Sequence, residues 1–287
     1  MEEIIIKTFE LNNKQTIPAV GFRVFMIPND GPTYDATLAA LKAGYRHIDT
    51  AAGYMNESDV GKAIKDSGVD RKEVFITSKL WLQDYGYENA KKGIETSLKL
   101  LGVDYIDLYL LHQPYGDYLG AWKALEEAYQ EGKIKSLGIS NITVNLWNKF
   151  KDGMTVMPAV NQVEFNPFVQ QKELRKVMAE NDIRLEAWFP LGHGNKDLLE
   201  NETIVSLAKK YNKNAGQIIL RWIYQKGVVS LPKSTNEERM KGNIDIFDFE
   251  LTDEEMKNMQ ALDTNKPSHN PEDPANETRL MGLKIHD

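Results

Sequence analysis

Four polar residues, each at or just after the end of an apolar segment, could act together on a carbonyl group. Asp49 and Tyr54 lie in GYRHIDTAAGYMNE (residues 44–57), Lys79 ends EVFITSK, and His112 ends YIDLYLLH. A phenol ordinarily titrates near about 10 and is a reluctant acid at neutral pH, but a neighbouring ammonium stabilises the phenolate. Lys79 could be that ammonium, Asp49 could hold it charged, and His112 could hydrogen-bond a carbonyl oxygen. Together they would polarise the carbonyl and give it a proton.

Each of these residues also has a structural interpretation. A lone Tyr or His at the end of a strand more often forms a structural hydrogen bond, and a Lys79–Asp49 pair could simply stabilise the fold. A third possibility is an unrelated barrel hydrolase or isomerase that uses Asp49 and Glu164. The chemical complementarity of the four residues favours the carbonyl chemistry.

The elements that would position these residues alternate regularly along the chain. Helical patterns at residues 88–101, 119–130, 171–181 and 215–225 lie between strand-like runs. Eight strands alternating with helices in about 250 residues predict a (β/α)8 TIM barrel, with residues 1–287 as one domain. A doubly wound sheet is the alternative, but the sequence has no G-x-G-x-x-G and no P-loop. The eight strand ends are Phe25, Asp49, Lys79, His112, Ser140, Glu164, Trp188 and Lys233.

Two segments lie outside this alternation. Residues 4–19 alternate apolar and polar residues around a polar turn, which predicts a β-hairpin before the barrel. The Pro-rich residues 266–276 predict a C-terminal tail that wraps the barrel.

Composition narrows the partner to a small molecule. The net charge of −7 and pI near 5.4 argue against a nucleic-acid or anionic-membrane surface, and the absence of cysteine excludes disulfides and thiolate-based metal sites. We predict no metal site. MEEIIIKTFE is not a signal peptide, and no window approaches a membrane span. We therefore expect a cytoplasmic protein, and a monomer.

A possible phosphate site follows the eighth strand. Barrels often bind phosphate through the loops after strands 7 and 8. Here Lys233, Ser234, Thr235 and Arg239 offer hydroxyls, amides and two cations, with the planar guanidinium suited to phosphate. The alternative is a solvated, charged start of a helix.

The chain resembles the aldo-keto reductase family over nearly its whole length. The matching motifs, in order, are GYRHIDTAAGYMNE, SKLW (78–81), LLHQP (110–114), SLGISN (136–141), PAVNQVEFNP (158–167) and LPKSTNEERMKGN (231–243). The resemblance implies Tyr54 as general acid, tuned by Lys79 and Asp49, with His112 orienting the substrate. It also implies that the hydride comes from a nicotinamide.

The same resemblance implies how the cofactor binds. The residues after strand 8 would grip the adenosine 2′-phosphate, so NADPH is expected in preference to NADH. Matching cofactor positions are Ser140, Asn141 and Gln162 at the carboxamide, Trp188 stacking on the ring, Leu191, and Asn243 at the adenine. The chain departs from the family pattern at Arg23, Phe189, His193 and Gly242, of which Arg23 replaces a glycine and could crowd or contact the cofactor or substrate.

The substrate side is expected to be open and shallow, because the connections after His112 and Trp188 are short. Phe25, Trp81 and Tyr115 are the expected pocket walls. The chain resembles the bacterial branch that includes 2,5-diketogluconate and methylglyoxal reductases, which implies small aldehydes, dicarbonyls or keto sugars as substrates. A nicotinamide-binding regulatory or structural protein on the same barrel is the alternative.

Overall fold

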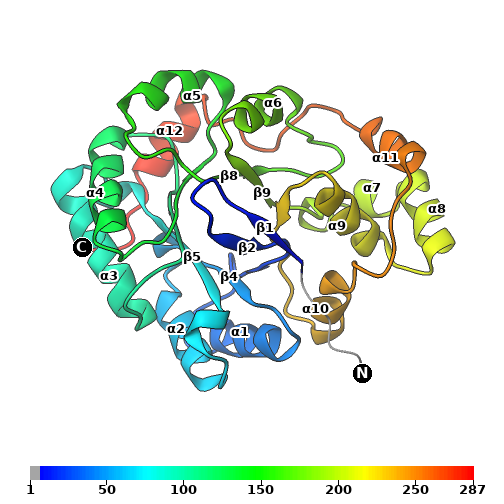
Figure 1. Ribbon diagram of the computed structural model, residues 1–287, viewed down its shortest axis with the longest axis horizontal. Helices are drawn as coiled ribbons and strands as arrows, with labels where there is room; N and C mark the ends of the chain where they lie inside the picture. The colour runs from blue at the N-terminus through cyan, green and yellow to red at the C-terminus, as the bar shows by residue number, and fades with distance from the viewer. Residues whose placement is uncertain (1–6) are drawn as a thin grey trace.

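A parallel sheet of eight strands closes on itself in the computed structural model, which describes residues 7–287 (Figure 1). Val20 pairs in parallel with Ser230, and the amide of Gly21 donates to the carbonyl of Ser230 at 2.9 Å, so the first and last strands meet. The predicted (β/α)8 barrel is confirmed, and the doubly wound sheet is wrong because its edge strands would stay apart. In sheet order the strands are β3 (Phe22–Arg23), β4 (His47–Asp49), β5 (Phe75–Leu80), β6 (Leu108–Leu111), β7 (Leu137–Ser140), β8 (Val160–Glu164), β9 (Arg184–Trp188) and β10 (Val229–Ser230).

Helices surround this sheet and bury their apolar faces against it (Figure 1). The pattern that predicted residues 215–225 matches α9, whose start is fixed by a capping box between Asn214 and Gln217. The other three predicted helices are also present, with ends shifted by one residue. The helices around the barrel are α1 (Pro32–Lys42), α2 (Glu57–Asp66), α3 (Tyr87–Leu101), α4 (Tyr118–Gln130), α5 (Val144–Phe150), α6 (Lys172–Glu180), α7 (Lys196–Leu199), α8 (Glu202–Tyr211), α9 (Ala215–Gln225) and α10 (Glu237–Ile244).

The eighth strand is shorter than predicted. It ends at Ser230 instead of Lys233. Pro232 interrupts the ladder because it has no amide hydrogen to donate. Its carbonyl still accepts from the amide of Arg23 at 3.2 Å, so the chain beyond the strand stays beside β3.

The predicted hairpin covers the amino-terminal end of the barrel. Its strands β1 (Thr8–Glu10) and β2 (Thr16–Pro18) pair antiparallel, while residues 4–6 of the prediction lie outside the described residues. Leu11 and Ile17 are buried in a small apolar cluster at the foot of the strands. The Asn12 amide donates to the carbonyl of Pro158 at 2.9 Å. The hairpin is therefore fixed to the barrel by both apolar and polar contacts.

The C-terminal segment crosses to the opposite end of the barrel. After α11 (Asp253–Gln260) the chain passes α6 and reaches α12 (Pro274–Met281) near α5 (Figure 1). The indole of Trp81 donates to the carbonyl of Leu283 at 2.9 Å, and the amide of Ile285 donates to Gln83 Oε1 at 2.8 Å. The predicted tail thus becomes part of the carboxyl-terminal mouth. None of the helices in residues 7–287 is long and apolar enough to span a membrane.

Candidate active site

Lys79 and Asp49 form a fully buried ion pair between neighbouring strands. β4 and β5 are parallel with Asp49 opposite Thr77, so Lys79 reaches back to Asp49 from the end of β5. Its Nζ lies 2.8 Å from both carboxylate oxygens and donates to the carbonyl of Thr50 at 2.7 Å. Both side chains have an exposed fraction of 0%. Three acceptors in a dry site hold the ammonium in one orientation.

Tyr54 is brought to this pair by a short 3-10 helix, η1 (Ala52–Tyr54). Its hydroxyl oxygen lies 3.4 Å from Lys79 Nζ and accepts from Arg23 Nη2 at 2.7 Å. The turn is held by Asn56, which accepts from the Thr50 hydroxyl at 2.8 Å and donates to the carbonyl of Val24 at 3.2 Å. The phenol therefore lies beside two cations, and the contact with the second one, Arg23, was not predicted from the sequence.

His112 follows β6 and lies edge-on between two aromatic rings. Its ring centroid is 5.5 Å from that of Tyr54 and 5.1 Å from that of Trp81. Burial, and then the charges of Lys79 and Arg23, hold the pKa of His112 well below its usual range. The imidazole is therefore neutral at physiological pH, and a neutral imidazole can still donate one N–H to a carbonyl oxygen.

A second polar layer lies beneath the pair, inside the barrel. The Gln162 amide donates to Asp49 Oδ2 at 2.8 Å and to Glu186 Oε2 at 2.6 Å. Burial and then the Asp49 carboxylate raise the pKa of Glu186 to about 8, so this carboxyl is mainly protonated at pH 7. His47 lies 3.7 Å from Glu186, and burial lowers the pKa of His47 to about 4. Both groups are thus mainly neutral at pH 7, and Asp49 is the carboxylate that contacts Lys79.

A cavity of about 480 Å³ lies at the carboxyl-terminal mouth of the barrel. Tyr54 and His112 line it, and so do Phe25 and Trp81, two of the three predicted walls. Tyr115 does not: it lines a separate cavity with residues of α4 and the C-terminal segment, because the chain after Pro114 turns away from the mouth.

The predicted nicotinamide contacts share this cavity. Ser140, Asn141, Gln162 and Trp188 all line it. The indole of Trp188 donates to Asn141 Oδ1 at 2.9 Å, and the Ser140 hydroxyl donates to the carbonyl of Gln162 at 3.0 Å. The ring of Trp188 is therefore fixed at the edge of the cavity.

A smaller cavity of about 220 Å³ adjoins the first through shared walls at Arg23, Phe25 and Phe189. Leu191 and Lys233 line its far side. Two of the family departures meet here, since Phe189 and His193 pack with ring centroids 4.8 Å apart.

The predicted phosphate residues lie at the start of α10. Ser234 is buried and its hydroxyl bonds to the backbone of Asn236, whereas Thr235 and Arg239 are exposed. Asn243 is buried on the same helix, next to Gly242. Within residues 7–287, neither Lys233 nor Arg239 forms an ion pair, so both cations are available to a ligand.

The C-terminal segment supplies a wall that the motifs did not reveal. Ser268, His269, Arg279, Leu280 and Leu283 line the 480 Å³ cavity, so the mouth is less open than the short loops suggested. Ser268 is anchored by Glu164, whose Oε2 accepts from its amide at 2.7 Å. Neither Asp49 nor Glu164 lines the cavity, so the two carboxylates that a hydrolase of that kind would use do not face it. No residue pattern in this segment marks it as part of a site.

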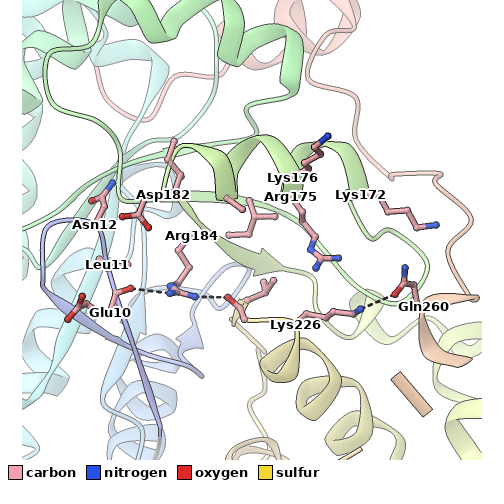
Figure 2. Close-up of a pocket in the computed structure, with 15 residues that line it drawn as sticks. Glu10, Leu11, Asn12, Lys172, Arg175, Lys176, Asp182, Arg184, Lys226 and Gln260 are labelled. Carbon is pink, nitrogen blue, oxygen red and sulfur yellow. Dashed lines mark hydrogen bonds between the residues drawn. The ribbon is translucent and has the colours of Figure 1, made fainter. Parts of the chain in front are cut away.

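A larger cavity, of about 720 Å³, lies away from all these residues (Figure 2). It is bounded by the hairpin, α6 and the start of β9. Arg184 crosses it and donates to the carbonyls of Glu10 at 3.1 Å and Gly227 at 2.8 Å (Figure 2). These two bonds tie the hairpin to the barrel, and a separate bond from Lys226 Nζ to Gln260 Oε1 at 3.1 Å lies at the other side of the cavity (Figure 2). Across residues 7–287, no cluster of three His, Cys, Asp or Glu side chains is arranged to hold a metal ion.

Comparisons with known proteins agree with this geometry. The model of the aldo/keto reductase family matches residues 29–264. The glyoxal reductase of Bacillus subtilis is 48% identical over 256 residues, covering 89% of this chain and 92% of that protein. The 9,11-endoperoxide prostaglandin H2 reductase of Trypanosoma cruzi is 42% identical over 258 residues, covering 89% and 91%. An aldo-keto reductase enzyme from a Medee basin deep-sea metagenome library superposes with a TM-score of 0.89 at 44% identity, covering 91% and 97%. An aldo-keto reductase of the silkworm Bombyx mori, complexed with NADPH, superposes with a TM-score of 0.86 at 30% identity, covering 92% and 90%.

Proposed function

This chain belongs to the aldo/keto reductase family, and we propose that it reduces small aldehydes, dicarbonyls or keto sugars to alcohols with NADPH, using Tyr54 as the proton donor. The observation that carries the proposal is that Tyr54 lines the cavity and that its hydroxyl oxygen has Lys79 Nζ at 3.4 Å and Arg23 Nη2 at 2.7 Å. The similar Bacillus protein is named for glyoxal, a dicarbonyl, which supports that substrate class.

The donor set fits an extended nicotinamide nucleotide. The cavity beside Tyr54 has amide and hydroxyl groups at Ser140, Asn141 and Gln162, and it adjoins the smaller cavity that ends at Lys233. Arg239 lies beyond, exposed and without an ion-pair partner in the described chain. We infer that these residues hold the carboxamide at one end and the adenosine phosphate at the other. NADPH supplies the hydride when bound.

The proton transfer follows from the groups around Tyr54. As the carbonyl oxygen gains negative charge, the phenol protonates it and becomes a phenolate. Lys79 and Arg23 stabilise that phenolate, since two cations face the oxygen in a largely desolvated site. Asp49 holds the Lys79 ammonium in place through both carboxylate oxygens at 2.8 Å, and neutral His112 donates a hydrogen bond to the carbonyl oxygen. The substrate carbon receives the hydride and its oxygen receives the proton, which completes the alcohol.

The experiment is a loss-of-absorbance assay of NADPH with a panel of small aldehydes and dicarbonyls. Tyr54→Phe should lower kcat by at least about 100-fold, the lower end of what a general acid contributes. Its affinity for NADPH, measured by fluorescence titration, should stay the same. Tyr115→Phe is the matched control, because it removes a phenol outside the cavity. Full activity in Tyr54→Phe would disprove the mechanism. NADPH binding by the wild-type protein without reduction of any carbonyl would favour the regulatory alternative.

A cytoplasmic location and a monomeric state are further parts of this proposal. Fractionation of the producing cells and light scattering of the purified protein would test them.

A further inference from the structure

Arg23 is an unusually placed cation. Its side chain is 8% exposed and lies at the end of β3, where its guanidinium stacks near the rings of Phe25, Phe189 and Trp188 at 4.9, 5.8 and 6.0 Å. Nη2 and Nε both donate hydrogen bonds to the hydroxyl oxygen of Tyr54, at 2.7 and 3.3 Å. Nη1 is buried and has no hydrogen-bond partner among the described residues. A buried donor on a charged group without a partner is costly, so it points to a missing acceptor.

The surrounding charges leave Arg23 in surplus. Among residues 7–287, the carboxylate within ion-pair distance of Arg23 is that of Asp49, whose Oδ1 is 3.6 Å from Arg23 Nε. That carboxylate is already bound by Lys79 through both oxygens at 2.8 Å. In the described part of the chain, two buried cations therefore share the one carboxylate that lies within ion-pair distance of either.

The rest of the cavity has the same sign. Its lining, taken from residues 7–287, includes Arg23, Arg279 and Lys284 but no Asp or Glu. This holds in a chain with a net charge of −7. A pocket of this sign attracts anions in preference to neutral molecules.

We propose that Arg23 binds the carboxylate of the substrate, so that the preferred substrates are carbonyl compounds with a carboxylate on the neighbouring carbon, that is, 2-oxo acids. This inference rests on the proposed function and narrows its substrate class. Nη1 and Nη2 belong to one planar group and Nη2 donates to the Tyr54 hydroxyl, so an anion on Nη1 would lie close to a carbonyl oxygen that is bound to Tyr54. A carboxylate attached directly to the carbonyl carbon meets that requirement.

The test compares an acid with its own neutral ester. Phenylglyoxylate and methyl phenylglyoxylate share the ketone and the ring and differ in charge. The wild-type protein with NADPH should have a kcat/KM at least about 10-fold higher for the acid. Arg23→Gln should lower this acid-to-ester ratio by about 10- to 100-fold, the range for a lost hydrogen bond between charged groups. The ratio separates substrate recognition from any effect on Tyr54, which acts on both substrates alike.

Two further variants sharpen the result. Arg23→Lys keeps the charge but not the fork, and should lose only part of the acid preference. Arg279→Gln removes an exposed cation from the rim, and should change the ratio by less than about 3-fold, an effect that 0.5 M salt abolishes. If Arg23→Gln does not fold, the wild-type ratio and the Arg23→Lys variant still decide the question.

Several outcomes would overturn the inference. If the wild-type protein reduces the ester as well as it reduces the acid, the carboxylate inference is wrong, although the proposed reductase function still stands. An Arg23→Gln variant that binds NADPH at least 10-fold more weakly, with an unchanged acid-to-ester ratio, would assign Arg23 to a cofactor phosphate instead. A protein that reduces neither compound nor any aldehyde in the panel would refute the proposed function, and the inference with it.

Discussion

Removing the ammonium of the buried ion pair by Lys79→Met should destabilise the fold by about 3 kcal/mol. Breaking a buried pair typically costs about 3 to 5 kcal/mol, because the remaining charge is stranded in a dry site. Asp49 would keep two partial partners, the Gln162 amide at 2.8 Å and Arg23 Nε at 3.6 Å. These partners place the expected loss at the lower end of the range.

The stranded charge can be tested directly. In Lys79→Met/Asp49→Asn the carboxylate becomes a neutral amide of similar shape, and the double variant should recover about 1 to 2 kcal/mol. Lys91→Met is the matched control. Its ion pair with Glu127 is of similar length, at 2.7 Å, but Lys91 is 42% exposed and screened by solvent, so its loss should destabilise the fold much less than the loss of Lys79.

The measurement is urea denaturation at pH 7 without cofactor. Tryptophan fluorescence and circular dichroism should be followed together, because coincident curves are needed before a free energy is extracted from a protein of this size. The reasoning is refuted if Lys79→Met costs no more than Lys91→Met. It is also refuted if replacing Asp49 in the Lys79→Met background brings no recovery, since the loss would then come from packing and not from charge.

Two other predictions concern the cofactor and the pH dependence of stability. Arg239→Ala should weaken NADPH binding by about 10-fold and leave NADH binding unchanged in fluorescence titrations. Lys241→Ala removes another exposed cation on α10 and should leave the affinity for both nucleotides unchanged. If Arg239→Ala weakens the binding of NADPH and NADH equally, the phosphate assignment is wrong. The raised pKa of Glu186, about 8 against an ordinary 4.5, means that its contribution to stability is complete below about pH 4.5 and is lost as the pH rises towards 8. The melting temperature of Glu186→Gln should therefore rise relative to that of the wild-type protein as the pH is increased from 5 to 8. A constant difference across that range would show that Glu186 ionises normally.

The barrel could be predicted from the sequence because local patterns determine its parts. Apolar runs that close at Asp49, Ser140 and Trp188 coincide with the ends of β4, β7 and β9. The apolar period of 3.6 residues located α9 to the residue. Strand 8 was overestimated because the run GVVSLPK stays apolar through Pro232, although the hydrogen-bonded ladder ends before it.

The site was only partly predictable, because side-chain reach is not encoded in spacing. The contact between Tyr54 and Lys79 follows from adjacent strands, whereas the two bonds from Arg23 to Tyr54 depend on the direction of one long side chain. Tyr115 was misplaced for the same reason, since the turn after Pro114 decides which cavity it faces. The wall near Leu283 comes from a segment about 200 residues from its Trp81 partner in sequence, and no local pattern reports such a contact.

The seam between Val20 and Ser230 has a consequence for how the chain is made. β3 is among the first parts of the barrel to leave the ribosome, and the strand that completes its pairing is the last of the eight. At about 5 to 20 residues per second, β3 waits for β10 for roughly 10 to 40 seconds. During that interval one side of the nascent sheet has unpaired backbone groups, which can join another chain. Slower translation would lengthen this exposure, so the yield of folded protein should depend on synthesis speed as well as on the stability of the finished barrel.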